Sequence, residues 1–246
     1  MFKDKVAIIT GGGGGIGLAA AQMLAAKGAK VLITGRTKTK LEEAAATNSN
    51  IKTFVADASD PDSAAKTVAA ALGYWGRIDI LVNNAGGGTI QPLENANAKS
   101  VNDIFSINVT GPILLASAAL PSLAETKGTI INISSTYGSK AGAGLSLYGA
   151  SKAAIEHLTR SWALELAPKG IRVNSIASGP VETAFLKERL GLSDEQINEV
   201  KEQERKTIPL GRRGVPDDVA TWIVHLAESG WITGQIIAVD GGLVIA

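Results

Sequence analysis

The residue types best suited to proton transfer are a tyrosine and a lysine four positions apart, Tyr148 and Lys152. They begin a helical stretch, so this spacing places both side chains on one face of a helix. A free tyrosine has a pKa of about 10 and is a poor acid near neutrality, but a neighbouring ammonium favours the phenolate and lowers that pKa. The pair therefore predicts a proton donor for a carbonyl oxygen. The pattern is weak when taken alone, because helices contain it by chance.

Two serines add hydroxyl groups upstream of this pair. The run from Thr129 to Ile133 has the composition of a buried strand and ends in Ser134-Ser135. In a parallel sheet the carboxyl ends of the strands form the ligand side. We therefore expect these hydroxyls to face a ligand.

A run of five glycines, Gly11 to Gly15, follows the first apolar run and opens a helix-like stretch. Consecutive glycines are entropically costly, and they allow backbone N–H groups to approach a bulky anion. The helix N-terminus adds roughly half a positive charge. The order of strand, loop, helix and strand predicts that this loop binds a pyrophosphate, rather than being a flexible turn without a ligand. Two spellings of the glycine pattern fit, one with Gly12, Gly14 and Gly17 and one with Gly11, Gly15 and Gly17.

The end of the second apolar run bears on the choice between NAD and NADP. A site for NAD expects Asp or Glu about 20 residues after the glycines, where it binds the ribose 2′-hydroxyl. Gly35 occupies that place, and Arg36 and Thr37 follow it. A guanidinium can pair with a 2′-phosphate through two hydrogen bonds. The sequence therefore predicts NADP(H), with NAD(H) as the alternative if Arg36 is only an exposed loop cation.

The composition excludes several classes of protein. The 246 residues contain 24 Lys and Arg against 23 Asp and Glu, a formal net charge of +1, which argues against a nucleic-acid partner because such a partner needs a basic surface. Hydrophobic residues make up 45% and charged residues 19% of the chain, which excludes a disordered protein. There is no cysteine and there are two histidines. This excludes disulfides and thiolate chemistry, and it predicts no metal site.

The N-terminal residues pass directly into an apolar run that stops at glycine, without the features of a signal peptide. No stretch contains about 18 uninterrupted apolar residues, so we expect no membrane span. The expected location is cytoplasmic.

Seven short runs rich in β-branched residues recur along the chain and are mostly apolar throughout. They are Val6 to Thr10, Lys30 to Thr34, Ile51 to Ala56, Ile78 to Asn83, Thr129 to Ser134, Ile171 to Ala177 and Gln235 to Val239. A strand of this kind is buried on both faces, which indicates a parallel sheet covered by helices. The prediction is a single α/β domain over residues 1–246, a Rossmann-type doubly wound parallel sheet of about seven strands with helices on both faces.

Helix boundaries also have signals in the sequence. A helix from Ile16 to Lys27 should end at Gly28, and Asp60 should be the N-cap of a helix with Pro61 at its first position.

The charged segment from Phe185 to Arg213, with Glu188, Arg189 and Asp194 among its charges, interrupts the alternation of strands and helices. It is either a solvated helical excursion or a mobile lid, at about residues 184–213, over a site at the strand ends.

Several motifs in a fixed order resemble those of the short-chain dehydrogenase/reductase family, of the single-domain kind. The matching pieces are Thr10 to Gly17, Asp57, Asn83-Asn84-Ala85-Gly86, Asn108, Ser135, Tyr148 with Lys152, Asn174 to Thr183, and Gly234 to Gly242. They span almost the whole chain.

The resemblance implies four catalytic residues. Tyr148 is the general acid in reduction and the base in oxidation, and Lys152 lowers its pKa and holds the nicotinamide ribose. Ser135, rather than Ser134, binds the substrate carbonyl, because its distance to Tyr148 along the chain matches the family better. Asn108 bends its helix, near the helix-weakening Gly111 and Pro112, and helps to hold a water that relays protons.

The resemblance also implies the cofactor-binding residues. Asp57 would contact the adenine, Asn83, Ala85 and Gly86 would flank the adenosine ribose, and Val181 and Thr183 would meet the nicotinamide carboxamide. The other members of the set are Gly11, Gly13, Gly14, Gly15, Ile16, Gly17, Arg36, Thr37, Ala58, Asn84, Tyr148, Lys152 and Pro180. Two positions depart from the family pattern: Ser178 stands where a proline is common, and Gly14 where NADP-preferring members often carry a basic residue.

The expected substrate residues are small or apolar. They are Gly87, Tyr137, Ala143, Leu147 and Phe185, with Gly88, Ala141, Gly142 and Leu186 nearby. No arginine among them could hold a carboxylate, so we expect an uncharged, moderately apolar ketone.

The expected function is transfer of a hydride from NADPH to a ketone carbonyl, in a reversible reaction. The alternatives are an NAD-dependent alcohol or 3-hydroxyacyl dehydrogenase and, in another class, a non-catalytic dinucleotide-binding sensor or scaffold. The resemblance further implies a homotetramer in which the helix after Lys152 contacts another subunit. The apolar stripe of Ile155, Leu158, Trp162 and Leu166 on that helix fits such a contact, and burial in the core would give the same stripe.

Overall fold

The computed structural model describes residues 2–188 and 191–246, and these contain one parallel sheet of seven strands. The strands are β1 (Val6–Thr10), β2 (Lys30–Gly35), β3 (Ile51–Val55), β4 (Ile80–Asn83), β5 (Thr129–Ser135), β6 (Arg172–Ser178) and β7 (Ile236–Val239). Their order across the sheet is β3-β2-β1-β4-β5-β6-β7. The predicted doubly wound parallel sheet is confirmed, and each predicted strand end lies within about two residues of the observed one.

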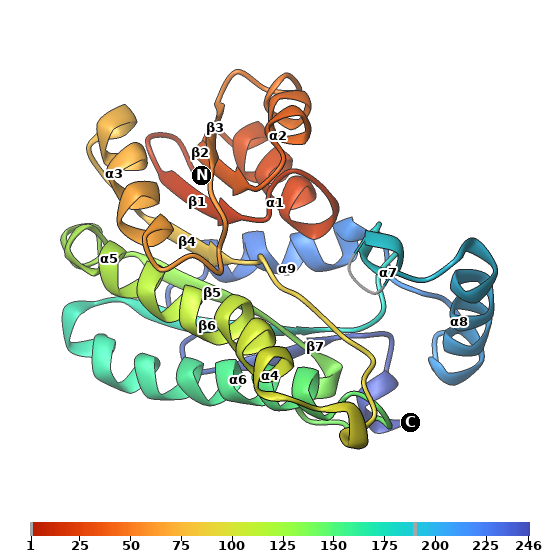
Figure 1. Cartoon of the computed structure of the whole chain (residues 1–246). Coiled ribbons are helices and arrows are strands. Elements are labelled where there is room, and N and C mark those ends of the chain that lie inside the picture. Colours follow the sequence, from red (N-terminus) through yellow and green to blue (C-terminus); the bar gives the residue numbers. More distant parts are fainter. Residues whose placement is uncertain (1, 189–190) are drawn as a thin grey trace.

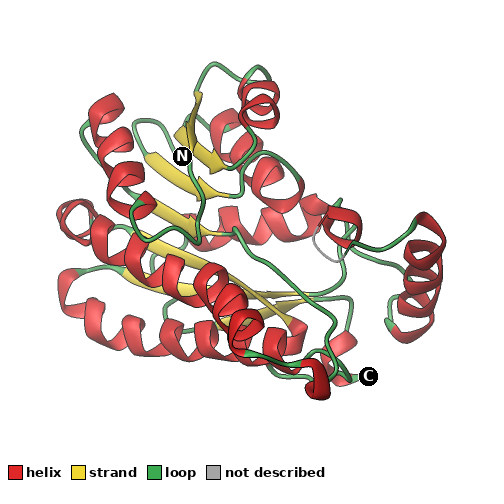
Figure 2. Ribbon diagram, in the orientation of Figure 1, coloured by secondary structure: helices red, strands yellow, loops and turns green. Residues whose placement is uncertain are grey.

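Helices cover both faces of this sheet (Figure 1; Figure 2). One face packs against α1 (Gly15–Ala26), α2 (Lys38–Ala45) and α9 (Pro216–Glu228), and the other against α3 (Ser63–Trp75), α5 (Gly111–Thr126) and α6 (Ser146–Leu166). The remaining helices are α4 (Ala98–Phe105), α7 (Phe185–Glu188) and α8 (Asp194–Thr207), with short 3₁₀ turns at Leu93–Asn95, Thr136–Gly138, Ala167–Lys169 and Leu243–Ile245.

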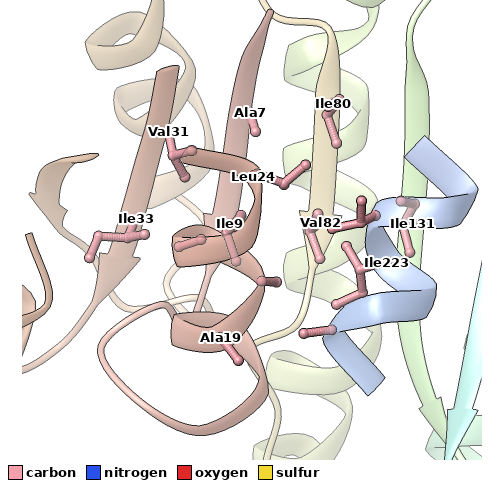
Figure 3. Packing of buried hydrophobic residues seen from close by; sticks show 14 of the residues in the cluster. Ala7, Ile9, Ala19, Leu24, Val31, Ile33, Ile80, Val82, Ile131 and Ile223 are labelled. Atoms are coloured by element: carbon pink, nitrogen blue, oxygen red, sulfur yellow. The ribbon is translucent and has the colours of Figure 1, made fainter. Parts of the chain in front are cut away.

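The strands are apolar throughout because successive residues face opposite covered sides. In β1, Ala7 and Ile9 belong to the core on the side of α1 and α9, whereas Ile8 belongs to the core on the other side. Figure 3 shows Ile9 and Val82 of neighbouring strands near Ile223 of α9. Burial on both faces therefore explains the uninterrupted apolar runs.

The helix boundaries follow the sequence signals at one site and depart from them at another. α1 ends at Ala26, and Gly28 adopts φ +97°, as predicted for a helix stop. The predicted helix start at Asp60 and Pro61 is wrong, because α3 begins at Ser63. The Asp60 carboxylate accepts hydrogen bonds from the Asp62 N–H at 3.0 Å and the Ser63 hydroxyl at 3.3 Å. It therefore forms a turn two residues before the helix.

A π-helical turn, Ser106–Thr110, joins α4 to α5. A Cβ at Gly111 would lie 2.0 Å from the Ala58 carbonyl oxygen, so this position needs glycine for the close approach of the two backbones. Within the described residues the joined helix, Ala98–Thr126, is long and apolar enough to cross a membrane. Core helices pass the same test, and this helix packs against α3 and α6. The prediction of no membrane span was based on the length of uninterrupted apolar runs. Polar residues interrupt the apolar run in this helix, so that criterion did not select it.

The charged insertion forms α7 and α8. No side chain of α8 is buried, and Figure 1 shows this helix standing apart from the helices that flank the sheet. Arg189, one of the charged residues noted in this segment, lies outside the described residues.

Candidate active site

A cleft with a volume of about 810 Å³ lies where the strands end. Its lining comes from six segments, within residues 11–16, 35–41, 84–90, 133–137, 145–152 and 178–213. They include the residues that follow β1 and β4, the neighbours between which the strand order reverses. Ligands of doubly wound sheets bind at such a point.

The glycine loop forms one wall of the cleft, with Gly13 and Gly14 on its lining. Gly11 and Gly15 adopt φ values of +68° and +54°, which favour glycine. A Cβ at Gly17 would lie 2.5 Å from the Gly11 carbonyl oxygen. The backbone therefore matches the spelling with Gly11, Gly15 and Gly17. Gly14, by contrast, is extended, with no atom within 4 Å of an added Cβ.

Of the predicted loop residues, Gly17 alone does not line the cleft, because it packs against the loop. The open space over Gly14 and the helix α1 behind it fit a diphosphate.

The end of β2 brings cationic side chains to the same cleft. Arg36 and Thr37 line it, as predicted, and so does Lys40 of α2. Lys40 forms an ion pair with Glu188 of α7. Lys40 was not among the predicted residues, although its position in the first turn of a helix that follows Arg36 could have indicated it.

The four predicted catalytic residues come from three elements and meet near Gly86. Ser135 ends β5, and its side chain hydrogen-bonds Tyr148 of α6. A Cβ on Gly86 would lie 3.0 Å from Asn108 Oδ1 and 3.4 Å from Lys152 Nζ. The fold therefore gathers side chains that lie up to 44 residues apart in the chain.

Asn108 lies behind the cleft, not on its lining. It is buried in the π-helical turn, and its Nδ2 donates to the Gly87 carbonyl and to Ser151 Oγ, both at 2.9 Å. The Gly87 N–H donates back to Asn108 Oδ1 at 2.9 Å. Asn108 thus lies in an irregular, π-helical part of its helix and fixes the segment after β4 against α6.

The two serines at the end of β5 have different partners. Ser134 Oγ donates to Glu156 Oε1 at 2.8 Å, whereas Ser135 contacts Tyr148. This separation agrees with the choice of Ser135 as the serine that faces a substrate.

Burial controls the protonation of the central pair. Burial lowers the pKa of Lys152 to about 8, against the opposing effect of the Glu156 carboxylate. Burial also raises the pKa of Tyr148 above its usual 10.0, although the hydrogen bond from Ser135 acts in the other direction. The expected lowering of the Tyr148 pKa by Lys152 is therefore wrong for the protein alone. Lys152 Nζ lies 5.8 Å from the centroid of the phenol ring and donates to the Ile133 carbonyl.

Of the residues expected at the adenosine, some line the cleft and others face the interior. Asn84, Ala85 and Gly86 line the cleft, and Asn84 Nδ2 donates to the Thr10 carbonyl at 2.8 Å. Asn83 is buried and donates to Asn132 Oδ1 at 2.9 Å, so it faces the interior.

Asp57, the residue expected at the adenine, does not line the large cleft, and neither does Ala58, which was also expected to bind the cofactor. Asp57 accepts hydrogen bonds from the backbone and the hydroxyl of Ser59. Ala58 lines a small adjoining pocket together with Ala85.

At the substrate end, Gly87, Tyr137 and Phe185 line the cleft, whereas Ala143 and Leu147 do not. The lining also contains residues that were not predicted, both apolar and charged, from distant segments. Among them are Ile90, Leu145, Val200, Gln203, Glu204 and Arg213. Arg213 is a cation at the substrate end of the cleft, where no arginine was expected. It is paired with Glu182 and Glu204.

Pro180, Val181 and Thr183, which were expected to bind the cofactor, line the cleft. A Cβ on Gly15 would lie 3.0 Å from Thr183 Cγ2, so this segment approaches the glycine loop. The cleft thus runs from Arg36 past the loop to Tyr148, and its donors fit a nicotinamide dinucleotide.

Known proteins share this architecture and sequence. The family model described as enoyl-(acyl carrier protein) reductase matches residues 12–244. The chain is 40% identical over 253 residues to the uncharacterized oxidoreductase MT0954 of Mycobacterium tuberculosis, covering 99% of this chain and 94% of that protein. It is 35% identical over 251 residues to the 3-oxoacyl-(acyl-carrier-protein) reductase FabG of Thermotoga maritima, covering 99% of both.

Two solved structures have nearly the same fold. A short-chain dehydrogenase/reductase of Caenorhabditis elegans, crystallised with cofactor, matches with a TM-score of 0.93 and 33% identity, over 100% of this chain and 97% of that one. Levodione reductase matches with a TM-score of 0.94 and 30% identity over 100% of both chains.

The parallel sheet, the glycine loop and the tyrosine–lysine pair define an oxidoreductase that uses a nicotinamide dinucleotide. The chain belongs to the short-chain dehydrogenase/reductase family.

Proposed function

We propose that the protein reduces a ketone to a secondary alcohol with NADPH, in a reaction that can run in reverse. The observation that carries this proposal is the convergence of Tyr148, Ser135 and Lys152 in the cleft that also contains the glycine loop. A hydroxyl donor beside a second hydroxyl suits one carbonyl oxygen held between them.

Each residue of the site has one role in the proposed reaction. The bound nicotinamide supplies the hydride. The Tyr148 hydroxyl gives its proton to the carbonyl oxygen in reduction and takes it back in oxidation, while Ser135 holds that oxygen. Lys152, protonated below its pKa of about 8, holds the nicotinamide ribose. Asn108 helps to hold a water that returns a proton to Lys152.

Preference for NADPH is supported by the cleft wall at the end of β2. Gly35, Arg36, Thr37 and Lys40 line it there. The Arg36 guanidinium suits a 2′-phosphate, whereas Lys40 is paired with Glu188. NADH is the alternative cofactor, and with it the reaction would be that of an NAD-dependent alcohol or 3-hydroxyacyl dehydrogenase.

The substrate end favours an uncharged ketone. Ile90, Leu145 and Val200 are apolar, and the buried Arg213 already pairs with two carboxylates. A guanidinium neutralised in this way has little attraction for an anionic substrate. FabG is named for a 3-oxoacyl substrate and levodione reductase for levodione, so ketones of both kinds belong in the test.

The segment of α7 and α8 is proposed as the lid of this site. Phe185, Leu186 and Val200 of these helices line the cleft. α8 has no buried side chain, and ion pairs of Lys201 and Glu204 connect it to the rest of the fold. Closure over a ketone would exclude water from the reacting atoms.

The experiment is an assay of NADPH and NADH oxidation over a panel of ketones, 3-oxoacyl thioesters and one enoyl thioester, with wild type and Tyr148→Phe. We expect turnover of a ketone with NADPH. We also expect a loss of about 10³-fold or more in the variant, with unchanged NADPH binding by calorimetry. Binding without turnover across the panel would favour the sensor or scaffold. Reduction of the enoyl thioester alone would move the reaction to a carbon–carbon double bond.

We also infer a homotetramer in the cytoplasm. Ile155 and Leu166 of the apolar stripe are buried in the core, so the stripe itself is weak support. Better support comes from Leu164 of α6 and Trp231 before β7, which are 82% and 99% exposed. Light scattering should give a mass about four times the 25.3 kDa of the chain. A mass of one chain would contradict the inference.

A further inference from the structure

Arg213 is a buried guanidinium in the segment that leads from α8 to α9. It is 5% exposed, whereas the adjacent Arg212 is exposed and pairs with Asp218 at 2.7 Å. A buried charge is costly unless it is paired and hydrogen-bonded. The partners of Arg213 therefore show what this arginine holds together.

The partners of Arg213 lie on two separate elements. Its Nη2 donates to the Val181 carbonyl oxygen at 2.7 Å, and its Nε lies 3.2 Å from Glu182 Oε1. Its Nη1 forms an ion pair with Glu204 of α8. Lys201 of α8 reaches Glu182 at 2.5 Å. Two cations and two carboxylates thus form a balanced cluster between α8 and the segment after β6.

The backbone next to Arg213 is hydrogen-bonded to the segment after β6. The Gly214 N–H donates to the Pro180 carbonyl at 2.9 Å, and the Glu182 N–H donates to the Gly214 carbonyl at 2.8 Å. Val181 and Gly214 form a parallel β-bridge. These backbone hydrogen bonds fix the segment that leads to Thr183, and Thr183 lies against the glycine loop.

We propose that Arg213 is a positioning residue that sets the segment Pro180 to Thr183 and ties the lid helix α8 to it through Glu204. The lid and the nicotinamide end of the cleft then keep one arrangement. Arg213 has no hydrogen bond or ion pair with the adenosine end at Arg36, which the lid reaches separately through the ion pair of Glu188 with Lys40. This rests on the proposed reduction with NADPH, in which Val181 and Thr183 meet the carboxamide. Because two carboxylates neutralise it, Arg213 acts through the backbone and not on the substrate.

Two variants of Arg213 test this role with a matched control. Arg213→Lys keeps the charge, but one ammonium cannot reach all three partners of a guanidinium. The double variant Arg213→Gln with Glu204→Gln removes both charges together, so no lone carboxylate is left buried, and Glu182 keeps Lys201. Arg212→Gln is the control, because it removes the neighbouring exposed cation. Thermal unfolding selects the variants that fold.

Three quantities are measured on each folded variant: the Kd of NADPH, the Kd of 2′,5′-ADP and kcat with a ketone. Since 2′,5′-ADP contains only the adenosine end, its Kd should stay within about twofold of wild type. The Kd of NADPH should rise about tenfold and kcat should fall about tenfold to a hundredfold, since small misplacements of reacting groups cost this much. Arg212→Gln should match wild type in all three.

An unchanged NADPH Kd and kcat in the Arg213 variants would overturn the proposal, and so would an equal weakening of both ligands. Glu204→Gln alone keeps Arg213 with Val181 and Glu182, and provides the test if neither Arg213 variant folds. It should weaken NADPH about threefold with 2′,5′-ADP unchanged, and an unchanged NADPH Kd would overturn the link to α8. Failure of wild type to bind NADPH would instead refute the proposed function.

Discussion

Lys152 Nζ donates a hydrogen bond of 2.9 Å to the carbonyl oxygen of Ile133. This bond fixes the lysine of α6 against β5, two residues before Ser135. The ammonium is buried at 6% exposure, and one carbonyl does not replace the water that it loses. Burial consequently lowers the pKa of Lys152 to about 8.

This arrangement predicts that Lys152 destabilises the free protein. The pKa is about 8 in the folded protein, against a usual value of 10.5. The ammonium therefore opposes folding fully below pH 8, and this effect disappears as the pH rises from about 8 to 10.5. Lys152→Met should raise the free energy of unfolding at pH 7 by about 1–3 kcal/mol while abolishing turnover. Urea unfolding at pH 7 and pH 10 measures the stability of both proteins, and the ketone assay measures the loss of turnover. A variant less stable than wild type at pH 7, with no change at pH 10, would contradict this account.

Ser134 and Ser135 provide a matched pair of substitutions. Ser135→Ala removes the hydroxyl beside Tyr148 and should lower kcat about 10²-fold to 10³-fold, with little change in stability. Ser134→Ala leaves the buried Glu156 carboxyl without its donor. This should lower the free energy of unfolding by about 1–3 kcal/mol and leave kcat near wild type. Steady-state kinetics and urea unfolding on both variants separate the two roles, and a reversed pattern would assign the catalytic hydroxyl to Ser134.

The sheet could be predicted from the sequence because its strands are buried on both faces. Ile8 and Ile9 face opposite cores, so the composition of β1 reports its environment directly. A shared site for Ser135, Tyr148 and Lys152 could be predicted because they stand in a recognisable order, and the fold places all three on the lining of one cleft. The sequence could not show which of the two spellings of the glycine pattern applies. The positions of positive φ depend on packing against Asn84, far along the chain.

Arg213 and the protonation of Tyr148 could not be predicted for the same physical reason. The partners of Arg213 lie on a strand end and on α8, and nothing near it in the sequence indicates burial. The Tyr148 pKa depends on how far the fold removes the phenol from water. A neighbouring lysine in the sequence does not reveal that.

Arg36 and Lys38 are two cations of one segment with different surroundings. Arg36 lines the cleft, whereas Lys38 pairs with Glu42 on the helix surface. If Arg36 binds the 2′-phosphate, Arg36→Ala should raise the KM of NADPH about tenfold to a hundredfold, since a charge-assisted hydrogen bond to phosphate contributes about 1.5–3 kcal/mol. It should leave the KM of NADH nearly unchanged, and Lys38→Ala should change neither. Equal effects of Arg36→Ala on both cofactors would show that this residue does not select NADPH.

Asp79 lies at the end of the sheet opposite the cleft, and its carboxylate joins Arg77 to the start of β1. Its carboxylate accepts hydrogen bonds from Arg77 Nε at 2.9 Å, Lys5 Nζ at 2.9 Å and the Val6 N–H at 3.0 Å. Burial raises the pKa of Asp79, but these donors outweigh that effect and lower the pKa below 3.8. The folded protein thus gains stability from the charged carboxylate above about pH 4. That stability is lost as the pH falls through the lower pKa of the folded state.

Asp79→Asn should therefore lower the free energy of unfolding at pH 7 by about 2–4 kcal/mol. The gap between variant and wild type should narrow as the pH falls below about 4, because protonation then removes the charge of the wild-type carboxyl. Asp218→Asn is the control, because Asp218 pairs with the exposed Arg212, and such pairs contribute about 1 kcal/mol or less. Urea unfolding between pH 2 and pH 7 measures both variants. A gap that stays constant across this range would show that Asp79 acts through packing and not through its charge.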